Sequence, residues 1–568
     1  MKELFRLIII ALILLAKCYI FEYSLVSYSL SWTIADIFIK SAAAILIALL
    51  ATITQRNYPI FIVLVITDIW LMANIVYFRA NHLFITWHLL WIVNNLDGFE
   101  SSVLPYLSWE LCLFPLLTLV TIVLCWLSFK KMKIGIIISV CVCGAFLSLC
   151  GSYCRWKEYR AKCLDSQLTL EWFNPFEIPK CLSAHISEIE RQPCMYISHR
   201  SILSYPLYMF NDAVRSIKKP NEQIELTDIE RQELDSLIDT SLVTTPIHSS
   251  LLIILLESFE SWLLNVKDAN NEPICPMLND YISSHNVLYV KDATTQIGYG
   301  MSGDGQMIIN TGLYPTLEGV ACVDYGYNTY PGIAHMYPYS AIVNPCRNVW
   351  NQNVVSSSYG YKQLIEPESD DRFEWNDSIV MDKIISTINH LDTPFCVMGI
   401  TVSGHIPFTQ VTNDIPISDT VPILFKNYMQ TAHFTDRQLG RLLLWADTAV
   451  VAKGGTIAIT GDHRIFHAWL GDDIKDYGVR ANLPFGTGQA GCPFILVNKN
   501  INNMVYDSCN QIDIFSTILA AIGQETYYWR GMGRDLLNET IGEYPNIELR
   551  RQLSDKLIRM DYFATLSH

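Results

Sequence analysis

Hydrophobic residues are distributed unevenly along this chain. Stretches of nearly continuous apolar sequence fill the first quarter, at residues 4–23, 34–54, 58–78, 111–129 and 134–151. Each is close to the roughly 20 residues that a helix needs to cross a bilayer. The pattern therefore predicts an N-terminal transmembrane domain of five helices, residues 1–152.

Basic residues predict the orientation of these spans. They occupy the start of the chain and the loops after the second and fourth spans: Lys2, Arg6, Arg56, Lys130, Lys131 and Lys133. Loops rich in lysine and arginine stay in the cytoplasm. Five spans then place everything after residue 152 outside the cytoplasm. The first span has no small-residue cleavage site, so we expect it to be retained.

A shorter aromatic stretch, residues 82–91, lies between the third and fourth spans. We interpret it as an interfacial or re-entrant helix on the outer face. A sixth span at this position is the alternative. It would move the following domain into the cytoplasm and break the charge rule.

The rest of the chain has the pattern of a soluble domain. Residues 153–245 are polar, with an acidic amphipathic stretch, and predict a helical connector. Residues 246–545 then alternate between apolar runs typical of buried strands and amphipathic helical patterns, which predicts an α/β domain with a mainly parallel central sheet. The strand-like runs are residues 249–256, 287–290, 395–400, 456–460 and 493–497, and the helical patterns are 428–447 and 512–522. Residues 546–568 are interpreted as a C-terminal tail.

Composition excludes some function classes. A net charge of -15 argues against a nucleic-acid partner. The spans carry only isolated charges such as Asp68, which argues against a transporter. Some of the 16 cysteines lie in the spans and are interpreted as small apolar residues. Others lie in the outer region, where disulfides can form with a connectivity that sequence does not reveal: Cys154, Cys163, Cys181 and Cys194.

Two of the apolar runs end abruptly in residues that bind metals. Glu257 follows the run at 249–256, and Asp462 and His463 follow the run at 456–460. Ligands of open α/β sheets bind beyond the carboxyl ends of the strands. A carboxylate after so apolar a strand is costly unless it is paired or metal-bound. We therefore expect these three side chains to converge on a divalent cation, whereas Glu260 fits an exposed loop position.

A serine lies between these motifs in the sequence. Ser302 follows a glycine-containing turn and precedes a segment, residues 304–311, that is plausible as a helix. A helix N-terminus favours phosphoryl oxygens and an alkoxide nucleophile. Taken alone, Ser302 would be interpreted as an N-cap. With Glu257 and Asp462-His463 nearby, we predict that it is the nucleophile and a fourth metal ligand.

A histidine follows another of the strand-like runs. His405 comes after residues 395–400 and can donate to a phosphate oxygen or pass a proton to a leaving group. His467 is a weaker candidate of the same kind. Carboxylate and imidazole ligands together suit manganese, magnesium or zinc.

These motifs resemble those of the lipoteichoic acid synthase family within the alkaline phosphatase and sulfatase superfamily. The resemblance covers the whole architecture of five spans, a connector and an extracytoplasmic catalytic domain. It rests on Glu257-Ser258-Phe259, on the segment from Asn310 to Pro315 that places Ser302 at the nucleophile, on His405 and on Gly461-Asp462-His463. Serine replaces the family's threonine at position 302, which keeps the hydroxyl chemistry.

The resemblance implies a function and its partners. It implies a manganese-type site, with magnesium or zinc as alternatives, and a covalent intermediate on Ser302. A phosphoglycerol head group would pass from a membrane phospholipid to a glycan or lipid acceptor in the cell envelope. The protein would be a multi-pass protein of the bacterial inner (cytoplasmic) membrane, with its catalytic domain extracytoplasmic or periplasmic.

The resemblance also implies a head-group pocket, and here the sequence departs from the family. Trp350 matches a substrate-contacting tryptophan, but Gln352 replaces an arginine and Val343 replaces a histidine. Arg347 can compensate for the lost charge. We therefore expect Trp350, Gln352, Arg347 and His405 to contact the substrate in an altered pocket, with phosphoglycerol as the default group.

Other functions stay open. A phosphoethanolamine transferase or a phosphodiesterase of the same superfamily shares the architecture. A sulfatase is excluded because the residues after Ser302 lack the proline or alanine and the arginine of its motif. A catalytically inactive membrane sensor or scaffold is disfavoured, since all four predicted metal ligands are present.

Overall fold

The computed structural model describes two compact units. They comprise Met1–Ala161 with Ile189–Glu222, and Lys162–Glu188 with Gln223–His568. The domain boundaries that the sequence predicts at residues 152, 245 and 545 stay predictions. The described residues are 2–25, 32–52, 58–81, 84–85, 107–125, 134–165, 196–197, 200–218, 224–242, 246–298, 300–317, 320–345, 349–367, 376–405, 408, 413–465, 472–481, 483, 490–524, 526–538 and 546–566.

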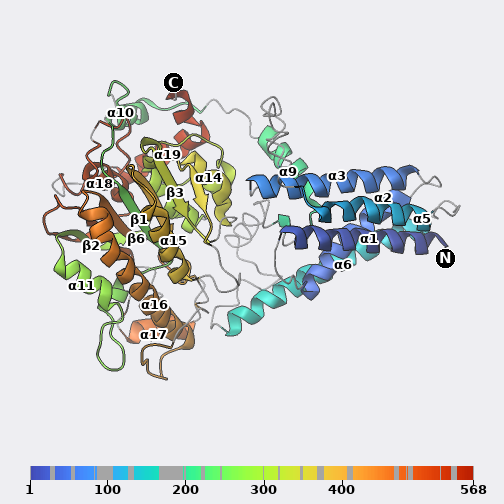
Figure 1. The fold of residues 1–568 in the computed structure, drawn as a ribbon, viewed down its shortest axis with the longest axis horizontal. Helices are drawn as coiled ribbons and strands as arrows, with labels where there is room; N and C mark the ends of the chain where they lie inside the picture. Colours follow the sequence, from blue (N-terminus) through green and yellow to red (C-terminus); the bar gives the residue numbers. More distant parts are fainter. Residues whose placement is uncertain are drawn as a thin grey trace. The chain divides into compact units, whose positions relative to one another are not determined.

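The first unit is built from apolar helices. They are α1 (Lys2–Leu25), α2 (Ile34–Thr52), α3 (Tyr58–Asn81), α5 (Leu113–Cys125) and α6 (Ile134–Asp165) (Figure 1). Among the described residues, α1, α2, α3 and α6 are long and apolar enough to cross a membrane, and Trp109–Leu124 is a shorter apolar helix. The multi-pass membrane prediction is therefore confirmed. Residues 126–129 of the predicted fourth span, and all of the predicted helix at 82–91 except 84–85, lie outside the described residues.

Charged groups inside this unit are paired, which corrects the interpretation of Asp68 as an isolated charge. Lys17 of α1 forms an ion pair with Asp68 of α3, and its Nζ lies 2.6 Å from Thr118 Oγ1 of α5. A second pair joins Lys40 to Glu22 at 2.7 Å. Sequence pattern missed these pairs because their partners lie on different helices.

The second unit contains one eight-stranded sheet. Its order is β4-β3-β5-β1-β6-β7-β2-β8, and only β7 runs antiparallel to its neighbours. The prediction of a mainly parallel sheet is confirmed. The strands are β1 (Leu251–Leu256), β2 (Val287–Thr294), β3 (Tyr339–Val343), β4 (Gln363–Ile365), β5 (Phe395–Ile400), β6 (Thr456–Gly461), β7 (Cys492–Val497) and β8 (Met504–Asn510).

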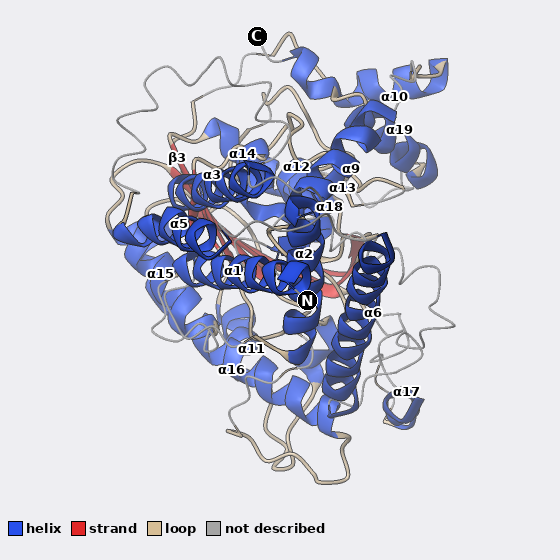
Figure 2. Cartoon of the chain, turned by 90° about the vertical axis from the view of Figure 1, so that its right-hand side faces the viewer, coloured by secondary structure: helices blue, strands red, loops and turns tan. Residues whose placement is uncertain are grey.

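Helices cover both faces of the sheet, as Figure 2 shows. Since β1 is buried on both faces, it reads as a continuous apolar run rather than an alternating one. One core lies under α12 (Ser302–Thr311), α14 (Gln352–Ser358), α18 (Asp513–Ala521) and α19 (Ile547–Arg559). The other lies under α11 (Pro276–Ser284), α15 (Asp377–Asn389) and α16 (Ile423–Ala446).

The two ends of this unit pack together. Lys556 of α19 reaches Glu230 of α10 (Asp228–Leu237) at 2.7 Å, and Arg550 reaches Glu233 at 2.6 Å. Leu553 of α19 is fully buried in the core. Helix α19 is thus part of the folded unit.

Cys154 is a free thiol. The side chains of Cys163, Cys181 and Cys194 lie outside the described part of the chain, so disulfides in the outer region stay a prediction.

Candidate active site

The strand register brings the predicted ligands to one edge of the sheet. β1 and β6 are parallel neighbours, with Leu256 opposite Gly461. The residues that follow these two positions are Glu257 and Asp462. The backbone N–H of Asp462 donates to the carbonyl of Leu256 at 3.0 Å, which extends the pairing into the site. Two motifs about 200 residues apart in sequence therefore become adjacent.

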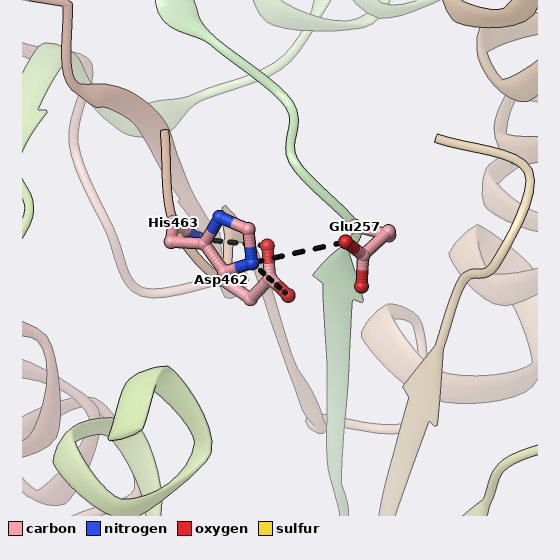
Figure 3. A group of neighbouring side chains, drawn as sticks. All are labelled: Glu257, Asp462 and His463. Carbon is pink, nitrogen blue, oxygen red and sulfur yellow. Dashed lines mark hydrogen bonds and ion pairs between the residues drawn. The ribbon is translucent and has the colours of Figure 1, made fainter. Parts of the chain in front are cut away.

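Glu257, Asp462 and His463 form a group that can hold a metal ion. One ligand atom from each lies within 4.8 Å of the others. His463 Nε2 lies 3.7 Å from Glu257 Oε1 and 3.6 Å from Asp462 Oδ2. Figure 3 shows the imidazole facing both carboxylates. His463 Nδ1 lies 2.8 Å from the carbonyl of Arg464, which orients the ring.

Only one oxygen of the Asp462 carboxylate accepts hydrogen bonds from the described part of the protein. Its Oδ1 accepts from the backbone N–H groups of Ser258 at 2.8 Å and His463 at 2.7 Å. Its Oδ2 is buried and accepts no hydrogen bond within the described part of the chain. An unsatisfied buried carboxylate oxygen is costly. A cation between Asp462 and Glu257 would satisfy it, so these residues fit a divalent metal.

Ser302 lies against the same group. It is the first residue of α12, and its Oγ lies 3.3 Å from Glu257 Oε2 and 3.1 Å from His463 Nε2. The hydroxyl therefore shares its surroundings with the candidate ligands and lies at the positive end of the α12 dipole. The structure brings together all four residues that the sequence predicted as ligands.

The turn before Ser302 has an unusual conformation. Met301 has a φ of 43°, in the region that bulky side chains avoid. Asp304 holds the chain there, because its Oδ2 accepts from the backbone N–H groups of Gly298 at 2.8 Å and Gly300 at 2.9 Å. Burial raises the pKa of Asp304 to about 6. Sequence analysis missed this role, and its only signal was an acidic residue in the first turn of a helix.

Glycine allows α12 to approach the loop after β6, which carries Asp462. A Cβ at Gly305 would lie 2.3 Å from the carbonyl oxygen of Asp462. No side chain fits at that distance. The helix that carries Ser302 therefore packs directly on the backbone that carries Asp462.

The electrostatics of the group favour a cation. Burial and the neighbouring Glu257 carboxylate raise the pKa of Asp462 to about 7. Burial also acts upward on the pKa of Glu257, but the charges of His463 and His405 hold it below its ordinary value. The pKa of His463 is raised, because the Asp462 and Glu257 carboxylates outweigh the effect of burial. Positive charge at this point relieves the repulsion between two carboxylates.

Glu260 corrects one expectation from the sequence. It is not an exposed loop residue, since only 2% of it is accessible. Its Oε1 accepts from the backbone N–H of Ile465 at 2.9 Å and its Oε2 from the indole of Trp262. It thereby ties the loop after β1 to the loop after β6, and burial raises its pKa to about 7.

Of the residues predicted to contact the substrate, the structure describes His405, Trp350 and Gln352. His405 is exposed, and the adjacent Gly404 packs on the carbonyl of Glu257. Trp350 has a φ of 53°, and its Cβ lies 3.3 Å from where a Cβ on Gly303 of α12 would be. Gln352 is buried, with Nε2 donating to Ser356 Oγ at 2.7 Å and Oε1 accepting from Asn344 at 3.4 Å. Its amide is thus occupied within the protein. Arg347 and His467 lie outside the described residues.

Comparison with known proteins identifies relatives of both units. Residues 1–159 match the family model described as the lipoteichoic acid synthase N-terminal domain. The chain is 25% identical over 316 residues to lipoteichoic acid synthase 1 of Bacillus subtilis, covering 51% of this chain and 48% of that protein. It is 22% identical over 509 residues to the lipoteichoic acid synthase of Staphylococcus aureus strain USA300, covering 83% and 73%.

The match thus spans about half the length of the Bacillus subtilis relatives. Among solved structures, the lipoteichoic acid synthase LtaP of Listeria monocytogenes is similar with a TM-score of 0.45 and 18% identity, covering 57% of this chain and 96% of that one. The Streptococcus pyogenes phosphoglycerol transferase GacH gives a TM-score of 0.39 and 16% identity, covering 59% and 89%.

Proposed function

We propose that this chain is a membrane-anchored phosphotransferase similar to lipoteichoic acid synthases. Its membrane domain matches the N-terminal domain of that family, and the curated relatives of the chain are lipoteichoic acid synthases. The protein would move a phospholipid head group, by default phosphoglycerol, through a covalent intermediate on Ser302 to a glycan or lipid acceptor in the cell envelope. The supporting observation is the position of Ser302 Oγ, 3.3 Å from Glu257 and 3.1 Å from His463. The curated relatives are named lipoteichoic acid synthases, which supports a membrane phosphotransferase, and phosphoglycerol is the head group that the resemblance of the motifs implies.

Glu257, Ser302, Asp462 and His463 would hold a divalent metal, manganese by resemblance. When bound, such an ion lowers the pKa of a hydroxyl and stabilises negative charge on a phosphoryl group. Ser302 is the first residue of α12, so the positive end of the helix dipole would favour a negatively charged phosphoryl group bonded to its Oγ. The protein thus supplies both a nucleophile and a preorganised positive environment.

Two displacements at phosphorus complete the proposed reaction. Ser302 gives up its hydroxyl proton to solvent, its Oγ attacks the lipid phosphodiester, and the bond from phosphorus to the diacylglycerol oxygen breaks. The exposed imidazole of His405 delivers a proton to that oxygen, so diacylglycerol leaves as the alcohol. An acceptor hydroxyl then attacks the phosphorus of the phosphoserine and gives its proton to His405, the bond from phosphorus to Ser302 Oγ breaks, and Ser302 regains a proton from solvent.

Intact-mass spectrometry tests this proposal. The purified full chain is incubated with manganese and phosphatidylglycerol beside Ser302→Ala and, as a matched control, Ser283→Ala, which changes an exposed serine of the same unit. We expect a phosphoglycerol-sized adduct in the wild type and in Ser283→Ala, and none in Ser302→Ala.

Other outcomes would revise the proposal in defined ways. An adduct formed from phosphatidylethanolamine but not from phosphatidylglycerol would keep the nucleophile and overturn the head group. Lipid turnover without an adduct would indicate fast hydrolysis, as in a phosphodiesterase. Metal-loaded protein with neither an adduct nor turnover would overturn the enzyme assignment.

A further inference from the structure

The chain beyond the last span returns to the membrane unit. Ser201 and Ile202 are fully buried. Trp70 of α3 donates its indole N–H to the carbonyl of Ile202 at 3.2 Å, and Ser201 Oγ lies 3.7 Å from Cys18 Sγ of α1. This segment is therefore packed among the membrane helices, although no apolar stretch in the sequence marks it.

The contacts define how deep the segment reaches. Cys18 lies seven residues before the end of α1 at Leu25, which is about 10 Å at the helical rise per residue. Trp70 lies nine residues before Arg79, whose guanidinium donates to the carbonyl of Ser24 near the same end of α1. An interfacial helix buries its apolar face about 5–10 Å into the boundary between head groups and acyl chains. The segment thus reaches interfacial depth.

The helix that follows has two apolar sides. In α9 (Tyr205–Lys218), Tyr205 is buried, with its ring 5.9 Å from that of Trp70 and 5.2 Å from that of Tyr208. The other side presents Leu207 and Phe210, which are 65% and 66% exposed. Residues three apart on a helix are neighbours, so these two form one exposed apolar ridge. Figure 1 shows α9 beside α3.

The surroundings indicate what covers this ridge. On α3, Ile66 and Ile69 are 61% and 63% exposed, as expected for the lipid-facing side of a span. The ridge on α9 belongs to the same unit, and aromatic residues such as Tyr205 and Trp70 favour the membrane interface.

We propose that α9 is an interfacial helix whose Leu207 and Phe210 insert into the outer leaflet of the phospholipid bilayer. It fastens the connector to the membrane at a second point, beyond the spans. This inference rests on the membrane unit alone and does not depend on the proposed reaction.

Photocrosslinking to lipid tests the proposal. Benzoylphenylalanine replaces one residue at a time in the full chain, which is reconstituted in vesicles of phosphatidylglycerol and phosphatidylcholine and irradiated. Ile69 of α3 is the positive control. Leu444 of α16 is the matched negative control, because it is an equally exposed leucine, at 67%, of the other unit. Intact mass then reports phospholipid adducts.

We expect adducts at positions 207 and 210 with at least half the yield at position 69, and at least tenfold more than at position 444. Yields at 207 and 210 equal to that at 444 would overturn the proposal. A crosslink of 207 or 210 to a second copy of the chain, without lipid adducts, would also overturn it, since the ridge would then be a protein interface. Each variant is first required to unfold at the wild-type temperature, so a folding defect is not mistaken for a negative result.

Discussion

A single buried carboxylate sets the position of the candidate nucleophile. Asp304 contacts none of the candidate metal ligands through the hydrogen bonds described above. Instead, it holds the backbone of Gly298 and Gly300 directly before Ser302. Catalytic geometry is sensitive to small displacements, and misplacement by about 1 Å can reduce a rate by about 100-fold. We therefore propose Asp304 as a positioning residue for Ser302, the proposed nucleophile.

We predict that Asp304→Ala lowers kcat by about 100-fold and changes KM by less than about threefold. Metal affinity should fall much less than kcat, because Glu257, Asp462 and His463 keep their positions and only Ser302 is displaced. Asp304→Asn, which keeps an oxygen for the two N–H groups, should recover part of the rate. Steady-state kinetics on phosphatidylglycerol and metal titration measure these quantities. Equal kcat values for Asp304→Ala and the wild type would contradict the role.

At the scale of elements, the site depends on α12 packing against the loop after β6. Gly305 leaves no space for a side chain beside the carbonyl of Asp462. Gly305→Ala should therefore push the helix and the loop apart, at a cost of about 1–3 kcal/mol of unfolding free energy, with a loss of metal affinity. Gly135→Ala in α6 is the control, since a Cβ there meets no atom within 4 Å. Thermal unfolding and metal titration of both variants measure these two effects. Equal losses of stability and metal affinity in Gly305→Ala and Gly135→Ala would contradict the role of the close contact at Gly305.

A second contact between elements gives a prediction about pH. Asp436 of α16 accepts from the backbone N–H groups of Met277 and Leu278, both at 2.8 Å, and so caps the start of α11. Burial raises the pKa of Asp436 from 3.8 to about 6. A folded-state pKa above the unfolded value means that the protonated carboxyl stabilises the fold. That stability is fully present below about pH 4 and is lost as pH rises to about 6.

Over that interval the loss amounts to about 3 kcal/mol. Asp436→Asn cannot ionise, so its unfolding free energy should vary less between pH 4 and pH 6 than that of the wild type. Chemical unfolding of the detergent-solubilised chain at several pH values measures the difference. Parallel curves for the two proteins would show that this carboxyl does not titrate in the window.

The sequence predicted the helices and strands whose residues follow a strong hydrophobic pattern. The buried strands at 395–400 and 456–460 were found because a strand buried on both faces is apolar throughout. β8 was missed, since most of its residues are partly or fully exposed, and β4 was missed because it has only three residues. The candidate ligands were recognised because Glu257 and Asp462 follow directly after apolar runs. Asp304 and Glu260 were not, because their roles depend on which backbone N–H groups lie nearby in space.

At the scale of the whole molecule, the chain combines an α/β unit that carries the candidate site with a membrane unit that contains buried charge. Hydropathy and loop charges predict the number and the orientation of the spans. The pairing of Lys17 with Asp68 does not, because 51 residues separate the two. Both side chains are buried, with 0% and 7% exposed. An unpaired charge at such depth is strongly disfavoured.

The Lys17–Asp68 pair therefore leads to a prediction about the fold of the membrane unit. Lys17→Met leaves Asp68 with Thr118 as its polar neighbour and should cost about 3–5 kcal/mol. Lys17→Met with Asp68→Leu removes both charges and should restore most of that loss. The exposed pair Lys291–Asp507, at 2.8 Å with 54% and 91% exposed, is the matched control. Lys291→Met should change stability by less than about 1 kcal/mol.

Thermal unfolding of the four proteins in the same detergent forms the comparison. If the pair joins α1 to α3 mainly by satisfying two buried charges, the single variant is the least stable and the double variant approaches the wild type. If the double variant is as unstable as the single one, the ion pair itself is required for the helices to pack. In that case, well-packed apolar side chains cannot replace its hydrogen bonds to Thr118.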